Sequence, residues 1–216
     1  MISRKALYLL GLMGAGILMA VSAVTAQHHG GGSPTRYESE DRDEWQMPDK
    51  VVALLDIEPG MVVADIGSSS GYFSRRLSPA VGSNGKVLAV DVDLKALTWL
   101  ANKAAEMGLS NIDTVHAGTD SAHLPKDGVD LIFFCNVLHH IGDKAGYLRD
   151  LKQALKPGGR LAVIEFFKKD LPVGPQDPAH KISWNETYRL LRDAGYKVVR
   201  EPQGLPYQYF IIARAE

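Results

Sequence analysis

One segment, residues 62–73 (VVADIGSSSGYF), constrains the fold of this 216-residue chain more than any other. Residues 61–64 form a short apolar, strand-like run, Gly67 and Gly71 flank a serine turn, and helical spacing of apolar residues resumes after it. Glycine lets the backbone approach a ligand closely, and the first N–H groups of the following helix face that ligand. The segment therefore predicts a strand, turn and helix that cradle a nucleotide.

Two aspartates indicate which nucleotide the cradle suits. Asp65 lies two residues before the first glycine, and Asp91 ends a second strand-like segment, residues 86–91 (KVLAVD). A carboxylate at the end of the second strand can accept both hydrogen bonds of a ribose diol. Dinucleotide-binding folds share that acid, but their fingerprint is G-x-G-x-x-G, whereas this chain has D-x-G-x-x-x-G.

From about Glu44 onward the chain resembles the class I S-adenosylmethionine-dependent methyltransferases, particularly the type 11 group that includes the ubiquinone and menaquinone C-methyltransferases. Five segments match the motifs of that family in order: DIGSSSG, AVDVD, AGTDSAHLP, VDLIFFCNVLHHI and LKPGGRLAVIEFF. They correspond to the cofactor loop, the ribose-binding strand end, the adenine segment, the fourth strand, and the turn with the fifth strand. The resemblance implies S-adenosylmethionine as cofactor and a small or lipid-like methyl acceptor.

The resemblance and the expected strand ends together give a set of cofactor-binding candidates: Asp65, Gly67, Ser69, Gly71, Asp91, Asp120 and Asn136. Asp120 would meet the adenine amino group, although Thr119 or Ser121 could take its place. Asp65 could instead organise the N–H groups of the loop. Ser69 departs from the family pattern, which has glycine there. If that position needs positive φ, serine costs about 1–2 kcal/mol more than glycine, which predicts reduced cofactor affinity.

Three residues are candidates for catalysis. His139 and His140 follow the fourth strand on the side of the acceptor, and imidazole titrates near neutral pH. Glu165 lies at the end of the fifth strand. Each has a structural alternative: a histidine can hold the loop by hydrogen bonds, and the glutamate can pair with a neighbour. No base is needed if the acceptor is already nucleophilic, because alignment then supplies most of the acceleration.

Aromatic and polar residues near the two ends of the domain are further candidates. Trp45 and Gln46, in the segment before the first strand, are expected either to form a lid over the cofactor or to belong to a helix with Trp45 in the core. Tyr207 and Tyr209 could line the acceptor pocket. We favour simple alternation of these two tyrosines across a terminal strand.

Strand-like and helical segments alternate along the chain. The expected strands are residues 61–66, 86–91, 112–116, 129–135, 160–166, 196–201 and 207–214, and the expected helices are 48–56, 71–80, 94–107, 143–155 and one that begins with the capping box of Ser183 and Glu186. This pattern predicts an α/β fold: a Rossmann-like, doubly wound, mostly parallel seven-stranded sheet with a C-terminal antiparallel hairpin. Such folds bind ligands beyond the carboxyl ends of the strands.

The N-terminal segment has a different character. Arg4 and Lys5 precede an uncharged stretch, residues 6–26, that ends in VTAQ. This pattern predicts a signal peptide cleaved after Ala26 and export to the periplasm or outside the cell. The stretch is near the ~20 residues that span a bilayer, so an uncleaved anchor, which would be the protein's only contact with the membrane, is the alternative.

The rest of the sequence limits the classes of function that remain. We expect a flexible tether at residues 27–43 and one methyltransferase domain at 44–216. His28 and His29 lack further ligands nearby, so no metal is expected. A net charge of −1 without a basic run argues against a nucleic-acid substrate. Two other functions remain: an exported cofactor-binding protein of the same fold with little or no catalysis, and a dinucleotide oxidoreductase, which the glycine spacing disfavours.

Overall fold

The computed structural model describes residues 33, 35 and 37–216. Helices in this part of the chain are α1 (Arg42–Gln46), α2 (Pro48–Leu54), α3 (Ser74–Val81), α4 (Leu94–Glu106), α5 (Lys144–Ala154) and α6 (Trp184–Asp193), with short 3-10 turns at Leu138–His140 (η1) and Pro178–His180 (η2). Strands are β1 (Val62–Ile66), β2 (Lys86–Asp91), β3 (Ile112–His116), β4 (Val129–Cys135), β5 (Leu155–Phe166), β6 (Tyr196–Arg200) and β7 (Gln208–Ala215).

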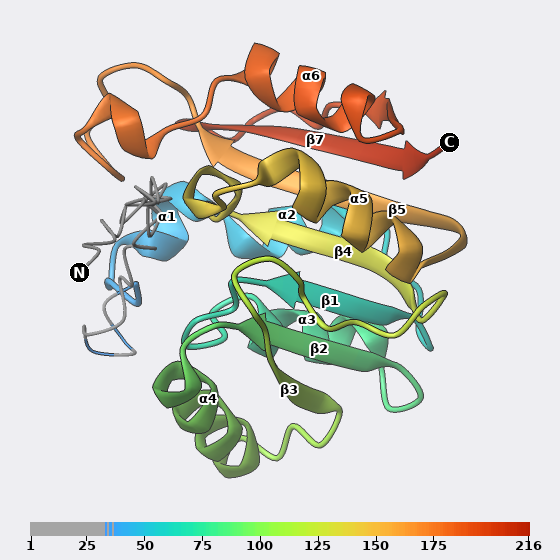
Figure 1. Cartoon of the computed structure of the whole chain (residues 1–216). Helices are drawn as coiled ribbons and strands as arrows, with labels where there is room; N and C mark the ends of the chain where they lie inside the picture. The colour runs from blue at the N-terminus through green and yellow to red at the C-terminus, as the bar shows by residue number, and fades with distance from the viewer. Residues whose placement is uncertain (1–32, 34, 36) are drawn as a thin grey trace, which may run out of the picture. The chain divides into compact units, whose positions relative to one another are not determined.

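The described strands form one seven-stranded sheet in the order β3-β2-β1-β4-β5-β7-β6 (Figure 1). The first five strands are parallel, and β7 runs antiparallel to both β5 and β6. This arrangement confirms the predicted fold class. Because β7 lies between β5 and β6, its first residue meets the last residues of β5 at the carboxyl edge of the sheet.

Helices cover both faces of the sheet, with α5 and α6 in front of it and α2 and α3 behind it in Figure 1. Successive side chains of β4 alternate between the two faces, as a doubly covered strand requires. Phe133 packs in the core with Leu77 of α3, whereas Phe134 packs in the core with Leu151 of α5. The near-continuous apolar run of β4 is therefore explained by burial on both sides.

Two element boundaries differ from the sequence prediction for a visible physical reason. Helix α3 begins at Ser74 and not at Gly71, because Gly71 has φ +76° and cannot be part of a right-handed helix. Strand β5 begins at Leu155, earlier than predicted. Its residues 156–159 (KPGG) form an irregularity between the pairs Val129↔Leu155 and Leu131↔Arg160, which the glycines and proline accommodate.

The structure also places the start of the folded domain earlier than residue 44. Glu38 and Asp43, expected to lie in the tether, form ion pairs with Arg75 and Arg76 of α3. The sequence shows these acids only as a polar segment, because their partners lie more than 30 residues away. The predicted signal peptide, and residues 27–32, 34 and 36 of the predicted tether, lie outside the described residues. Within the described residues, no helix is both long and apolar enough to span a membrane.

Candidate cofactor and active site

Three central strands bring the cofactor-binding candidates together at one edge of the sheet. Strands β2, β1 and β4 are neighbours, and each has its carboxyl end at that edge. The loop after β1 is attached to the neighbouring strand, because the N–H groups of Gly67 and Ser68 both donate to the carbonyl oxygen of Val90, at 2.8 and 3.0 Å. The loop at residues 67–71, Asp91 and Asn136 are 20 or more positions apart in the chain, but they lie at the same edge of the sheet.

The cofactor loop, residues 67–71, needs its two glycines for space as well as for conformation. Gly67 has φ +68°, and a Cβ built on it would lie 2.5 Å from a methyl group of Val137. Gly71 has φ +76°, and its Cβ would lie 2.2 Å from Leu100. Ser69, where the family has glycine, also lies in the left-handed region, with φ +49°. The loop has the glycine-like backbone of a close-approach turn even where it carries a side chain.

Asp91 is bonded to this loop. Its Oδ2 accepts the Ser69 N–H at 2.8 Å, and its Oδ1 accepts the Asp93 N–H at 2.9 Å. A carboxylate has about four acceptor positions, so two remain for the hydroxyls of a ribose. Asp93, in turn, caps α4 by accepting the N–H of Lys95.

Asp65 is buried at the end of β1, with 3% of its surface exposed. Its Oδ2 accepts the hydroxyl of Ser74 at 2.6 Å, so its partner is a side chain at the start of α3 rather than the N–H groups of the loop. Burial raises the pKa of Asp65 to about 7, the Ser74 hydrogen bond opposes this shift, and the nearby charge of Asp91 adds to it. Asp65 can therefore gain or lose a proton near neutral pH.

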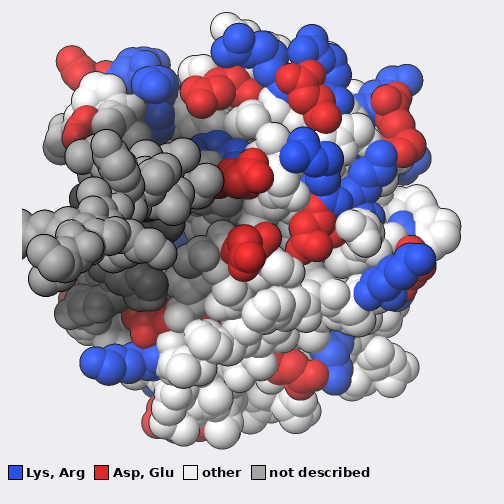
Figure 2. All heavy atoms as spheres, in the orientation of Figure 1, with Lys and Arg blue, Asp and Glu red and all other residues white. Residues whose placement is uncertain are grey.

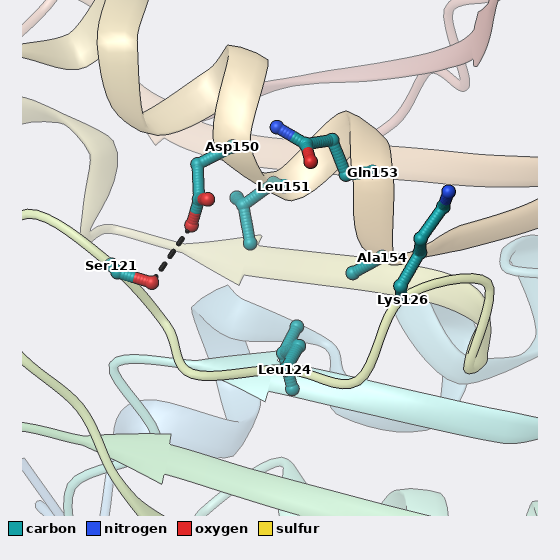
Figure 3. A pocket seen from close by; sticks show the side chains of 7 residues that line it. All are labelled: Ser121, Leu124, Lys126, Asp150, Leu151, Gln153 and Ala154. Carbon is teal, nitrogen blue, oxygen red and sulfur yellow. Dashed lines mark hydrogen bonds between the residues drawn. The ribbon is translucent and has the colours of Figure 1, made fainter.

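Asp120 lies in an exposed turn after β3, in which the Gly118 N–H donates to the carbonyl of Ser121 at 3.0 Å. The Ser121 hydroxyl donates to Asp150 of α5 at 2.9 Å (Figure 3), so Ser121 already has a structural partner. The groove between this loop and α5 has a volume of only about 100 Å³. It is too small for a nucleoside. Asp120 and Thr119 are both exposed, so both remain candidates for the adenine contact in this loop.

Asn136 follows β4 and belongs to a network of three amide side chains. Its backbone has φ +59°, and its Oδ1 accepts the Gln208 amide at 2.8 Å. Gln208 in turn accepts the amide of Gln46 at 2.7 Å, and both glutamines are buried. Cys135 lies next to Gln46, and burial raises the pKa of its thiol to about 12, so it stays protonated. The network links α1, β4 and β7 at the edge that holds the cofactor loop.

The three catalytic candidates are neighbours. Glu165 is fully buried at the end of β5, its Oε2 lies 2.7 Å from Nδ1 of His139, and its Oε1 accepts the His139 N–H at 3.2 Å. The ring of His140 lies 4.0 Å from that of His139, measured between centroids. The glutamate carboxylate thus favours the histidine tautomer with a proton on Nδ1, which leaves the lone pair on Nε2.

Residues 37–46, which we call the N-terminal strap, cross this edge. Glu38 accepts the hydroxyl of Ser70 in the cofactor loop at 2.6 Å and pairs with Arg75. Asp43 accepts the hydroxyl of Tyr72 at 2.5 Å. At the end of the strap, Gln46 joins the amide network, and the ring of Trp45 lies 5.6 Å from that of Phe166. Figure 1 shows α1 beside the carboxyl ends of the parallel strands.

Unpaired polar atoms identify the same edge independently. In residues 33, 35 and 37–216, the buried side-chain polar atoms without a hydrogen-bond partner are Arg42 Nε, Ser68 Oγ and His139 Nε2. They belong to the strap, the cofactor loop and the turn after β4. Such atoms are destabilising unless a ligand or another group satisfies them. Together with the glycine cradle, they fit a polar, nucleoside-containing cofactor such as S-adenosylmethionine.

Comparison with known proteins identifies the family. Residues 57–195 match the family described as Methyltransferase domain, which is more than half of the chain. The chain therefore belongs to the class I S-adenosylmethionine-dependent methyltransferases, in the type 11 group. This confirms the family that the motifs predict.

Individual relatives agree with this family. The ubiquinone/menaquinone biosynthesis C-methyltransferase of Vibrio campbellii is 31% identical over 150 residues, which cover 69% of this chain and 56% of that protein. The chain thus spans only about half the length of the curated relatives it matches. A crystal structure of a SAM-dependent methyltransferase from Aquifex aeolicus is 30% identical, with a TM-score of 0.79 over 85% of this chain and 98% of that one. The magnesium protoporphyrin IX methyltransferase of Synechocystis PCC 6803, solved with bound SAM, shares the fold at 20% identity, with a TM-score of 0.62 over 87% of each chain.

Sequence reasoning missed two contributors to the site, Arg42 and Gln208. Arg42 lies in a charged segment that resembles an ordinary solvated surface, and Gln208 begins a strand whose neighbours are apolar. A polar amide in that position was the available signal for Gln208, because buried polar side chains need partners. No local pattern marks Arg42, since its environment is built by Tyr72 in the turn before α3, Asp65 of β1 and Cys135 of β4.

Proposed function

We propose that the protein transfers the methyl group of S-adenosylmethionine to a small or lipid-like acceptor. The observation that carries the proposal is the meeting of the glycine cradle, Asp91 and the three unpaired buried polar atoms at one sheet edge. The names of the relatives, which are C-methyltransferases of ubiquinone and menaquinone biosynthesis, support a small-molecule acceptor with lipid character.

Different residues at this edge suit different parts of the cofactor. Gly67 and Gly71 allow the backbone to approach the ligand, and Asp91 retains acceptor capacity for two ribose hydroxyls. Asp120 is accessible for an adenine amino group. S-adenosylmethionine, when bound, supplies an electrophilic methyl group. The Gln46–Gln208–Asn136 network holds α1, β7 and the turn after β4 together at this edge. A rigid edge of this kind favours catalysis by alignment of the methyl group with the acceptor.

A cavity beside Gln208 supports an acceptor with an apolar, ring-sized part. It has a volume of about 210 Å³ and lies between the end of β5, the start of α6 and the start of β7. Its wall combines apolar and aromatic side chains, from Phe167, Trp184, Leu205, Tyr209 and Phe210, with the polar side chains of Glu201, Gln203 and Gln208. An apolar cavity of about 150 Å³ holds a benzene molecule in another protein, so this one has room for a ring but not for a whole lipid.

His139 and Glu165 are suited to remove a proton from the acceptor. Glu165 holds Nδ1 of His139, and the unpaired Nε2 is the atom that can accept a proton. The same groups could instead hold the turn after β4 in place. A Glu165→Gln variant separates the two roles, because the amide keeps the size of the side chain but no longer holds the imidazole as a carboxylate does.

Methyl transfer to a host extract tests the proposal. The full chain is incubated with S-adenosylmethionine labelled in the methyl group and with a lipid and small-molecule extract of the native host. Label in an extract component, lost in Asp91→Ala, is the expected result. Binding of the cofactor without any labelled product contradicts the proposal.

That outcome would favour the second candidate, an exported cofactor-binding protein of the same fold. Ser69 is the specific observation behind it, because a serine stands at φ +49° where the family has glycine.

Export itself is part of our proposal and is supported by the arrangement of Arg4, Lys5 and residues 6–26. On the face shown in Figure 2, acidic and basic side chains are interspersed, which supports a small-molecule substrate over a nucleic acid.

A further inference from the structure

Arg42 has a buried hydrogen-bond donor that its neighbours do not use. Its Nη1 donates to the carbonyl of Tyr37 at 2.6 Å, and its guanidinium carbon lies 3.6 Å from the centroid of the Tyr72 ring. Its Nε is buried and has no hydrogen-bond partner. A guanidinium carries five N–H groups in a rigid fork, so this one retains donors for a further acceptor.

The charge of Arg42 acts at the ends of two strands. It lowers the pKa of Asp65, at the end of β1, against the larger effect of burial, and it acts in the same direction on Cys135, at the end of β4. Strands β1 and β4 are adjacent, and the cofactor loop follows β1 directly. The guanidinium is therefore next to the loop that is expected to hold the cofactor.

The strap holds Arg42 in this position from both sides. Before it in the chain, Glu38 is bonded to Ser70 and paired with Arg75. After it, Asp43 is bonded to Tyr72, and Gln46 is bonded to Gln208. A guanidinium fixed in this way loses little conformational entropy when it binds an anion, so it is organised for binding before the ligand arrives.

We propose that Arg42 binds the carboxylate of the methionine part of S-adenosylmethionine, which makes the N-terminal strap part of the cofactor site. The inference rests on the proposed function in taking this molecule as the cofactor. An arginine fork matches a carboxylate in a bidentate manner. The buried Asp65 beside it is complementary to the ammonium group of the same amino acid, so the two side chains suit a zwitterion.

Two ligands that differ only in this carboxylate test the proposal. The full chain and its Arg42→Gln variant are titrated by calorimetry with S-adenosylmethionine and with decarboxylated S-adenosylmethionine. Loss of a charge-assisted hydrogen-bonded pair predicts a ten- to hundredfold weaker binding of S-adenosylmethionine by the variant. For the decarboxylated ligand we expect a change of less than about threefold, since Arg42 would have nothing to bind.

Arg76→Gln is the matched control. Arg76 lies over the same ring, with its guanidinium carbon 4.0 Å from the Tyr72 centroid, but its charge is already paired with Asp43. Its replacement should affect the two ligands equally. If Arg42→Gln does not fold, as judged by circular dichroism, Arg42→Lys replaces it, because lysine keeps the charge but loses the fork and should still weaken S-adenosylmethionine selectively.

The outcomes separate this inference from the proposed function. If Arg42→Gln weakens both ligands equally, or weakens neither, Arg42 only positions the strap and the inference is wrong, while the proposed function stands. If the wild-type protein binds neither ligand, the proposed cofactor is wrong, and the inference falls with it.

Discussion

Ser69→Gly should stabilise the folded protein by about 1 kcal/mol. Ser69 has φ +49°, and its N–H is bonded to Asp91 at 2.8 Å, so the loop holds the residue in the left-handed region. That conformation costs a residue with a Cβ about 1–2 kcal/mol more than glycine. The greater freedom of glycine in the unfolded chain offsets about 0.4–1 kcal/mol of this. The remaining gain corresponds to a rise in Tm of about 2–4 °C for a chain of this size.

The same substitution should leave cofactor affinity nearly unchanged. The backbone strain belongs to the folded protein before a ligand binds, so its relief changes the free energy of unfolding and not the dissociation constant. Weaker binding, as expected from the sequence, would then have to come from crowding by the serine hydroxyl alone. A titration with S-adenosylhomocysteine measures this contribution separately.

Thermal unfolding of Ser69→Gly and Ser69→Ala decides whether backbone strain or the serine hydroxyl causes the change in stability. Alanine removes the hydroxyl but keeps the Cβ, so it should not raise Tm. A glycine variant that melts at or below the wild-type temperature would refute the strain argument, as would an alanine variant that gains as much as glycine.

Four further predictions concern charge, binding, catalysis and location. The folded-state pKa of Asp65, about 7, lies above its ordinary value, so between about pH 4 and pH 7 the folded protein keeps a proton that the unfolded chain has lost. Wild-type stability should therefore fall as the pH rises through that window, relative to Asp65→Asn, by about 3 kcal/mol between pH 5 and pH 8 in urea unfolding, and parallel behaviour of the two proteins would exclude a raised pKa. Asp91→Ala should bind S-adenosylhomocysteine ten- to hundredfold more weakly, from the loss of about 1.5–3 kcal/mol, and an unchanged dissociation constant in a folded variant would refute the ribose assignment. If His139 is a general base, its replacement by glutamine should lower kcat for the extract component by about 10²–10⁴ with little change in KM, whereas a full kcat would leave it a purely structural role. N-terminal sequencing of protein from the native host should find a chain that starts at Gln27, and a cytosolic product that keeps Met1 would exclude export.

The sheet was predictable because its signals are local. Four of the five parallel strands, β1, β2, β4 and β5, contain a short apolar run. The fold rule for parallel sheets brings their carboxyl ends together, so Asp65, Asp91 and Asn136 could be assigned to one edge. The pairing of Glu165 with His139 was less accessible. Both residues were candidates on their own. Their contact depends on the distance between the ends of β4 and β5, and spacing along the chain does not give that distance.

The strap was not predictable for a related reason. Its contacts join residues far apart in the chain, such as Gln46 and Gln208, separated by 162 positions. Local patterns carry information over a few helical turns or strand residues, whereas these partners are brought together by the insertion of β7 beside β5. The alternatives for Trp45 and Gln46 thus stayed open until the fold placed Gln46 next to Asn136 through Gln208.

Calorimetric titration of the full chain with S-adenosylmethionine, S-adenosylhomocysteine and NAD tests the central claim most directly. If the edge formed by residues 67–71 and Asp91 is a site for the methyl donor, the two adenosyl ligands should each bind at one site per chain, Asp91→Ala should weaken both, and NAD should give no saturable heat. Saturable binding of NAD without binding of either adenosyl ligand would contradict the claim.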